Sequence, residues 1–189
     1  TISFHHHLRG GDYVLNMVLD EIAKMGIRDL TVNASSLFDC HMPLMDYIRK
    51  GVVTGLETDY VSGGIGKELS SGILDKPVIF YSHGTRPCRI AGGESHIDVA
   101  FLAAPTSDDM GNCTGKCGPS ACGSLGYAMA DAMYADKTVI ITDNLVPYPC
   151  RQQSITEDYV DYVVKVDSIG DPKGIVSGTT RMPKAPVAL

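Results

Sequence analysis

The chain has 189 residues, of which 44% are hydrophobic and 20% charged, and its formal net charge is −6 at pH 7. This length fits one domain with a sizeable core, and the acidic balance without a basic stripe excludes nucleic acid as the expected partner. Because no apolar run approaches membrane-spanning length and no signal peptide is recognisable, we expect no membrane partner and a cytoplasmic location.

The first predicted element is a short strand that runs into a polar turn and then a helix. Residues 1–4 alternate between small polar and apolar side chains, and the turn after them holds His5, His6, His7, Arg9, Gly10 and Gly11. From residue 13, apolar side chains recur at helical spacing until Gly26, with Asp12 as a candidate N-cap. Because such a turn joins a strand's carboxyl end to a helix's amino end, we expect a loop that faces a ligand.

The histidine run by itself does not predict a metal site. In extended geometry the first and third of three consecutive residues share a face, so at most two of the histidines act together.

Strands and helices alternate along the rest of the chain. The predicted strands cover residues 30–35, 53–59, 77–82, 97–105, 137–143 and 161–166, and the predicted helices cover 41–50, 67–74 and 124–135. Between them we expect a glycine-rich turn at 62–66, a turn at 83–86 that leads into a segment ending at 92–93, and a long loop at 106–123. Several strands are continuous apolar runs, which indicates an α/β fold with a mostly parallel sheet and helices on both faces.

Polar, glycine-containing turns follow many of these strands. They come after Phe4, Tyr60, Ser82, Pro105 and Asp143. Since the carboxyl ends of parallel strands meet at one edge of a sheet, we expect the turns to converge on one crevice.

The six cysteines show none of the usual metal-binding spacings. No CxxC pair occurs, and Cys113, Cys117 and Cys122 are separated by three and four residues. We therefore expect free thiols rather than disulfides or structural zinc, and no metal site. We also expect no permanently bound cofactor. A cysteine nucleophile would need a partnered base, and the sequence leaves open whether His41 or His83 approaches a thiol.

Two further motifs are open to a functional and a structural interpretation. The SGGIG turn lacks both the P-loop ending and the GxGxxG spacing, so it indicates only a tight turn. The turn at 82–85 offers an imidazole donor and backbone amides to a developing oxyanion, or His83 is simply a surface histidine. Residues 108–112 fit either a site turn or ordinary Asx-turn chemistry.

Taken in order, several long segments resemble the CoA-transferase family over essentially all 189 residues. They include SFHHHLRGGDYVLNMVLDEIAKMG, ETDYVSGGIGKELSSGILDKPVIFYSHG, HIDVAFLAAPTSDDMGNCTGK and SACGSLGYAMADAMYADKTVIITDNLVPYP. The resemblance implies an α/β fold shared with ribose-5-phosphate isomerase. Since full-length members are much longer, it also implies that residues 1–182 are the amino-terminal of two similar halves, followed by a linker-like end at 183–189.

The resemblance further implies an activity: citrate plus acetyl-[acyl-carrier protein] gives citryl-[acyl-carrier protein] plus acetate. The thioester is carried on a CoA-like prosthetic group of an acyl-carrier subunit, and a separate lyase subunit then cleaves the citryl thioester, so we expect an oligomeric complex. In related enzymes a glutamate attacks the thioester. Its motif has no match here, so we expect the nucleophile outside this chain and the chain alone to be inactive.

The resemblance also suggests substrate-binding residues. The glycine-rich substrate loop of the family matches Arg9, Gly10 and Gly11, and a Ser-Asn-Asn turn matches Ser62, Gly63 and Gly64, with both amide side chains lost. A Gln-Gly-Thr turn that supports the oxyanion matches His83, Gly84 and Thr85. A Gly-Asn turn of the same cleft matches Gly111 and Asn112. Our hypothesis is that Arg9 and one of His5 or His7 hold citrate carboxylates, with His83 supporting an oxyanion.

Two other functions stay open at this stage. One is a sugar-phosphate isomerase or deaminase of the same fold, which would act without a thioester. The other is a non-catalytic module that binds a metal or ligand through the cysteines.

Overall fold

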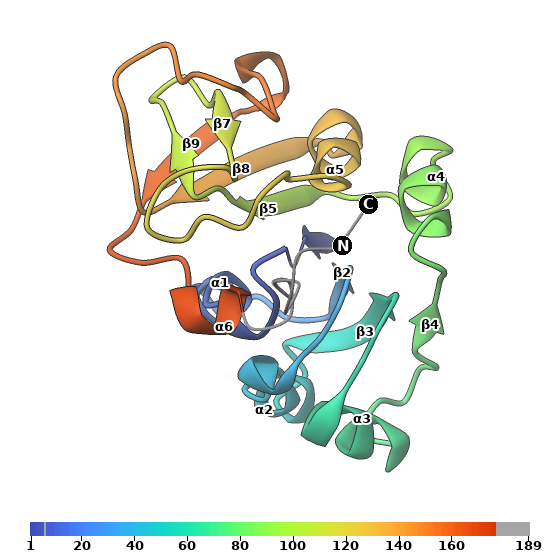
Figure 1. Ribbon diagram of the computed structural model, residues 1–189. Coiled ribbons are helices and arrows are strands. Elements are labelled where there is room, and N and C mark those ends of the chain that lie inside the picture. The colour runs from blue at the N-terminus through green and yellow to red at the C-terminus, as the bar shows by residue number, and fades with distance from the viewer. Residues whose placement is uncertain (6, 177–189) are drawn as a thin grey trace, which may run out of the picture.

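The computed structural model describes residues 1–5 and 7–176 (Figure 1), so the linker-like end predicted at 183–189 lies outside the described residues. Within them, one sheet has seven strands: β1 (Ile2–Phe4), β2 (Leu30–Ala34), β3 (Val53–Thr58), β4 (Ile79–Phe80), β5 (Val99–Ala103), β8 (Lys137–Thr142) and β9 (Tyr162–Lys165). Their order is β4-β3-β2-β1-β5-β8-β9, and every neighbouring pair is parallel. The chain adds strands first on one side of β1 and then on the other, so the strand order reverses between β1 and β5.

Helices cover both faces of this sheet. On one face α1 (Val14–Lys24), α2 (Leu44–Arg49), α3 (Gly63–Ser70) and α6 (Pro172–Val176) contribute side chains to the larger core, and on the other α4 (Thr85–Ala91) and α5 (Ala128–Tyr134) contribute to the smaller one (Figure 1). The predicted α/β fold with a parallel sheet between helices is confirmed.

Alternation along the central strands divides the two cores. Ile2 and Phe4 of β1 belong to the larger core, whereas Ala100 and Leu102 of the neighbouring β5 belong to the smaller one. Phe101 of β5 points the other way and stacks on Phe4, with 5.8 Å between the ring centroids. Because both faces of these strands are covered, their sequences are apolar almost throughout rather than at every second residue.

The helix predicted at 67–74 is displaced toward the amino terminus. Helix α3 begins at Gly63, inside the predicted turn 62–66, and its last residue is Ser70. Gly63 and Gly72 have φ of +64° and +83°, so glycine turns enclose the helix at both ends. The prediction took Gly63–Gly66 as a break, but Gly64 and Gly66 lie within the helix.

Three segments predicted as turn or loop contain regular structure. Helix α4 occupies most of the segment 83–93, and in the loop 106–123 β6 (Thr106–Ser107) pairs antiparallel with β7 (Cys113–Thr114). A short 3₁₀ helix (Arg9–Gly11) forms in the polar turn after β1. The helix predicted at 41–50 is divided into a 3₁₀ helix (Asp39–His41) and α2. In the part of the chain that is described, no helix is long and apolar enough to cross a membrane.

Candidate functional site

A cavity of about 300 Å³ opens at the carboxyl ends of the central strands, beside the point where the strand order reverses. Open parallel sheets bind ligands at this place, because the loops on the two sides of the reversal diverge there. Its lining residues come from the turns after β1 and β2, the turn before α4 and the loop before α5: His5, His7, Arg9, Ser35, Ser36, Phe38, His83, Cys122, Ser124, Leu125, Gly126 and Tyr127.

His5 and His7 lie side by side in this cavity, as their spacing predicts. Their Nδ1 atoms are 2.9 Å apart, and Nε2 of His7 lies 2.6 Å from the carbonyl oxygen of Ala103 at the end of β5. A carbonyl only accepts, so His7 carries its proton on Nε2, and its Nδ1 then accepts a hydrogen bond from Nδ1–H of His5. Burial lowers the pKa of His7, although the bond to Ala103 and the charges of Asp12 and Asp131 oppose it. This keeps His7 neutral and leaves His5 as the donor of the pair.

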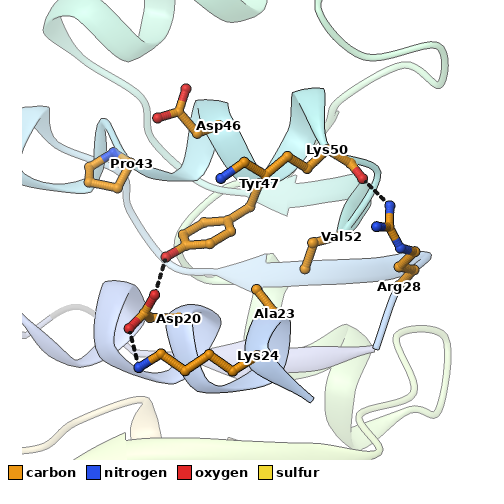
Figure 2. A pocket seen from close by; sticks show the side chains of 9 residues that line it. All are labelled: Asp20, Ala23, Lys24, Arg28, Pro43, Asp46, Tyr47, Lys50 and Val52. Atoms are coloured by element: carbon orange, nitrogen blue, oxygen red, sulfur yellow. Dashed lines mark hydrogen bonds and ion pairs between the residues drawn. The ribbon is translucent and has the colours of Figure 1, made fainter. Parts of the chain in front are cut away.

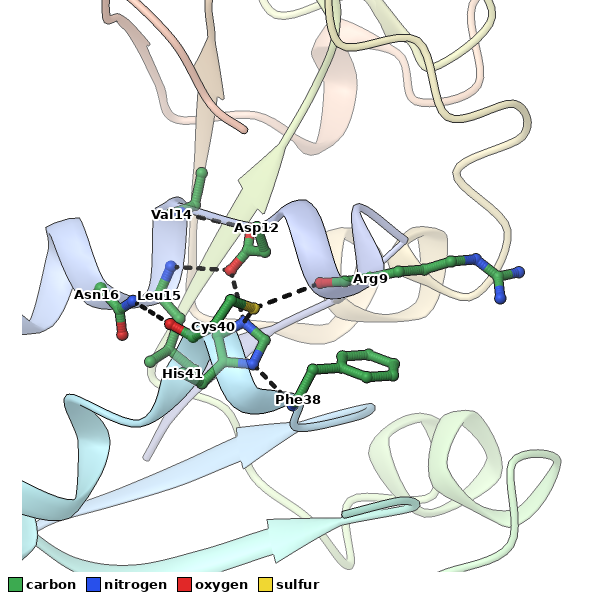
Figure 3. A network of polar contacts seen from close by, with 8 residues as sticks. All are labelled: Arg9, Asp12, Val14, Leu15, Asn16, Phe38, Cys40 and His41. Carbon is green, nitrogen blue, oxygen red and sulfur yellow. Dashed lines mark hydrogen bonds and ion pairs between the residues drawn. The ribbon is translucent and has the colours of Figure 1, made fainter. Parts of the chain in front are cut away.

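Arg9 brings a positive charge to the lining of the cavity, where His7 is neutral. Its backbone has φ of +54°, an uncommon conformation for a residue other than glycine, and its carbonyl accepts from the amide of Asp12. Figure 3 shows the guanidinium extending away from the polar contacts around Asp12. None of the described residues that line the cavity carries a carboxylate, so its wall is locally positive on an acidic protein.

His83 enters the cavity from the turn before α4 and stands against a buried carboxylate. Its Nδ1 lies 2.9 Å from Oδ2 of Asp59, whose side chain is 3% exposed whereas that of His83 is 60% exposed. The ring of His83 meets the ring of Tyr127 edge-on, with 5.1 Å between centroids. Burial raises the pKa of Asp59, while the positive charges of Arg86 and His83 oppose that rise.

A fully buried arginine lies behind this pair. Arg86 makes a two-pronged ion pair with Asp131 at 2.8 and 2.6 Å, and its Nε donates to Asn33 at 2.7 Å. Asn33 in turn donates to Glu57, which also accepts from Tyr81 and Ser95. This network joins β2, β3, α4 and α5. Because three donors occupy Glu57, we assign it to the network rather than to chemistry in the cavity.

A second polar cluster, drawn in Figure 3, contains a cysteine beside a histidine but is structural. The amide of Phe38 donates to Nδ1 of His41, so the proton of His41 is on Nε2, which lies 3.0 Å from Asp12. Cys40 Sγ is 3.5 Å from the same Nε2, which therefore has no lone pair to accept the thiol proton. Burial raises the pKa of Cys40 to about 11, as expected of an inert thiol. Asp12 was predicted as the N-cap of α1, but the N-cap is Tyr13; from the preceding position Asp12 accepts from the amides of Val14 and Leu15.

The two glycines after Arg9 have a packing role in this structure. A Cβ on Gly11 would collide with the carbonyl oxygen of Asp171 and lie 2.7 Å from the amide nitrogen of Ile175, so Gly11 permits α6 to approach the turn. Gly10 faces the same helix with more room, since the nearest atom to such a Cβ would be 4.0 Å away. Neither glycine lines the cavity, and their assignment to substrate stays a prediction.

The Ser62–Gly64 turn lies at the start of α3, beside Asp39 and outside the cavity lining. The amide of Gly64 donates to Oδ1 of Asp39 at 2.7 Å, so an internal carboxylate occupies one backbone donor of the turn that the resemblance assigns to a ligand. Gly84 follows His83 directly, just before α4, and is exposed with open space around it.

Gly111 and Asn112 are placed apart from the cavity. The side chain of Asn112 bonds both Asp108 and Glu157, and Gly111, with φ of +103°, packs against Val160. Of the turns expected to converge, those after Phe4 and Ser82 line the cavity, and the long loop after Pro105 reaches it through Cys122. The turns after Tyr60 and Asp143 do not line it.

The sequence analysis missed Ser35, Ser36 and Phe38, the stretch 122–127 and the buried Asp59. The two serines had a usable signal, because they end a predicted strand just as His5 and His83 follow theirs. Asp59 ends the predicted strand 53–59 and had the same signal, but nothing in the sequence pattern indicated its contact with His83, which lies in the turn before α4.

The cysteines do not gather into a metal site among the described residues. There the one group with metal-ligating geometry is His96, Asp98 and Asp136, all exposed, and Nε2 of His96 lies 3.0 Å from Asp136. A second cavity, of about 370 Å³, lies between α1 and α2 (Figure 2). Two of its charged groups have partners within the lining: Lys24 pairs with Asp20, and Arg28 donates to the carbonyl oxygen of Lys50.

Comparison with known proteins shows the family of this chain. The family described as citrate lyase, alpha subunit (CitF), matches residues 1–189. The citrate lyase alpha chain of Escherichia coli K12 is 50% identical over 186 residues, which are 98% of this chain and 36% of that protein. The chain thus spans about a third of the length of such relatives.

Solved structures give the same picture. A Streptococcus mutans protein, described as the putative alpha subunit of citrate lyase in complex with citrate, is 56% identical with a TM-score of 0.92, over 98% of this chain and 36% of that one. Glutaconate coenzyme A-transferase from Acidaminococcus fermentans has a TM-score of 0.59 at 15% identity, over 87% of this chain and 70% of that one. The second likeness shows the fold alone, which is that of the CoA-transferases.

Proposed function

The chain belongs to the citrate lyase alpha-subunit family, and we propose that it forms the citrate-binding side of the crevice in which that subunit acts. There, acetyl is exchanged for citryl on a carrier thioester: citrate plus acetyl-[acyl-carrier protein] gives citryl-[acyl-carrier protein] plus acetate. A citrate carboxylate becomes the new acyl group, and acetate leaves.

The observation that carries this proposal is the charge of the cavity at the strand reversal. His5, His7, Arg9 and His83 line it, and no carboxylate does among the described residues. Citrate carries about three negative charges at neutral pH, so it needs donors and a positive charge rather than acidic neighbours. The citrate named in the description of the Streptococcus mutans relative supports the same ligand class.

Within the cavity we assign each donor a part. Arg9 pairs with one carboxylate of citrate. His5 bonds another by turning its Nδ1 proton, which His7 accepts in this structure, toward the ligand. His83 supports the oxyanion that forms when the thioester carbonyl is attacked. The attacking glutamate comes from the part of the protein beyond this chain, so this chain alone is inactive.

The proposed partners follow from the reaction. The thioester arrives on a CoA-like group of an acyl-carrier subunit, and a lyase subunit cleaves the citryl thioester in the same complex. This chain needs no permanently bound cofactor for its part, because its own side chains supply the donors. We place this complex in the cytoplasm.

The proposal is tested by citrate-dependent release of acetate from acetyl-CoA. The full-length protein should show this activity and this chain alone should not. In the full-length protein Arg9→Ala should raise the Michaelis constant for citrate about tenfold or more, because a charge-assisted pair is lost. Arg28→Ala is the matched control, since Arg28 belongs to the other cavity. An unchanged Michaelis constant in Arg9→Ala would contradict the citrate site. Turnover of a phosphosugar, or stoichiometric zinc in the purified protein, would support the rival functions instead.

A further inference from the structure

Asp59 has a buried side-chain carboxylate that lacks the hydrogen bonds usual for such a group. Its side chain is 3% exposed, and neither oxygen receives a hydrogen bond of good geometry from the described residues. The contact it has is Nδ1 of His83, 2.9 Å from Oδ2. Buried polar groups are nearly always hydrogen-bonded, so a carboxylate in this state indicates a function rather than a contribution to stability.

We propose that Asp59 is a positioning residue that holds His83 by Nδ1, leaves Nε2 to the cavity and stabilises the imidazolium as a charged donor to an oxygen of the substrate. This inference rests on the proposed function, because it assigns a protonation state to a donor of that same site.

Geometry supports each part of this assignment. Asp59 directly follows β3 and His83 lies two residues before α4, so two separate elements bring them together. An aspartate next to Nδ1 fixes which nitrogen carries the proton, and a second proton on Nε2 then makes the ring a cation. His83 is one of the residues that line the cavity, so its donor is available to a ligand there.

The charges around Asp59 come from three elements. Arg86 of α4 and His83 favour the ionised carboxylate, whereas Asp131 of α5 and burial disfavour it. The guanidinium of Arg86 donates to Asp131 and Asn33, and neither oxygen of Asp59 receives a hydrogen bond from it. Asp59 therefore remains available as an acceptor for His83. Around His83 itself, the edge of Tyr127 packs on the ring.

A double-mutant cycle in the full-length protein tests the assignment. The four proteins are wild type, Asp59→Asn, His83→Gln and the double variant, each assayed for kcat and KM in citrate-dependent exchange. Asp59→Asn should lower kcat/KM about 10- to 100-fold, the cost of losing a charged hydrogen-bond partner. A glutamine amide donates without protonation, so in the His83→Gln background Asp59→Asn should change kcat/KM less than about twofold.

Asp136→Asn is the matched control, because Asp136 also lies 3.0 Å from a histidine, His96, but away from the cavity. It should leave kcat/KM unchanged. Equal losses from Asp59→Asn in the two backgrounds would overturn the inference, as would a fully active Asp59→Asn. Thermal unfolding of each variant establishes that it folds, and Asp59→Glu, which keeps the charge, should recover part of the activity.

A chemical readout separates this inference from the proposed function. Diethylpyrocarbonate reacts with unprotonated imidazole, and peptide mass spectrometry measures the modification of each histidine. At pH 6, His83 should react several times faster in Asp59→Asn than in wild type, while His96 reacts equally in both. Equal rates at His83 would overturn the inference even in an active enzyme. Absence of exchange in the wild type would instead remove the proposed function and leave the modification result standing.

Discussion

Nε2 of His7 lies 2.6 Å from the carbonyl oxygen of Ala103, and this bond ties the turn after β1 to the end of β5. The two strands are neighbours in the sheet although His7 and Ala103 are 96 positions apart in the chain. The bond therefore holds His7, which lines the cavity, at the point where the strand order reverses between β1 and β5.

The bond makes stability depend on pH in a defined direction. Burial lowers the pKa of His7 in the folded chain below its ordinary 6.5, so the unfolded chain binds the proton more readily. The free energy of unfolding should fall as the pH drops below 6.5. In His7→Gln, which cannot be protonated, the loss between pH 7 and pH 5 should be smaller. Urea unfolding at several pH values measures both slopes, and identical slopes would show that His7 does not contribute.

The packing of α6 on the polar turn predicts opposite outcomes for two adjacent glycines. Gly11→Ala should destabilise the chain by about 1–3 kcal/mol or more, because its Cβ would meet the backbone of Asp171 and Ile175. Gly10→Ala, with no atom closer than 4.0 Å to the new Cβ, should be within about 0.5 kcal/mol of wild type. Chemical denaturation compares them. Equal destabilisation by both substitutions would argue that backbone freedom, not packing of α6, is the reason for the pair.

The buried ion pair between Arg86 and Asp131 predicts strong coupling. Arg86→Met alone should cost about 3–5 kcal/mol in unfolding free energy, because it leaves the carboxylate of Asp131 buried without a counter-charge. Adding Asp131→Leu should restore most of that loss, since two apolar side chains can replace a buried pair. Denaturant titration of the two variants measures the recovery. A double variant less stable than Arg86→Met would mean that Asp131 has other partners of equal weight.

The thiols should differ in their reactivity toward iodoacetamide at pH 8. Cys88 and Cys117 are exposed, whereas burial raises the pKa of Cys113 and of Cys122 to about 12. Cys88 and Cys117 should therefore be alkylated well before Cys113 and Cys122. In a separate test, Cys40→Ala in the full-length protein should keep full exchange activity. Mass spectrometry of the labelled peptides gives the order. Early labelling of Cys122 would instead identify a reactive thiol in the cavity wall.

Periodicity predicted the fold well because the sheet is buried on both faces. Strands such as 97–105 have no competing interpretation, and the order of strands and helices then requires a parallel sheet. The errors fall where backbone conformation depends on tertiary contacts. Helix α3 begins at glycines that local propensity takes as breakers, and the carboxylate of Asp39 from another segment stabilises its first turn.

The candidate site was predictable only in part for the same reason. His5, His7 and His83 follow predicted strands, so the strand-end rule found them. Asp59 acquires its role from Arg86 and His83, which stand in a segment that carried no helical pattern. Gly11 was assigned to a ligand because glycine signals close approach, but the sequence does not say that the approaching backbone is that of α6.

The bond from Gly64 to Asp39 makes the start of α3 a poor place for an anion. There the protein's own carboxylate already balances the partial positive charge of the helix end. Arg9, in contrast, has no internal counter-ion among the residues that line the cavity. A molecule with several carboxylates is therefore attracted to the histidine-lined cavity and not to the glycine turn outside it.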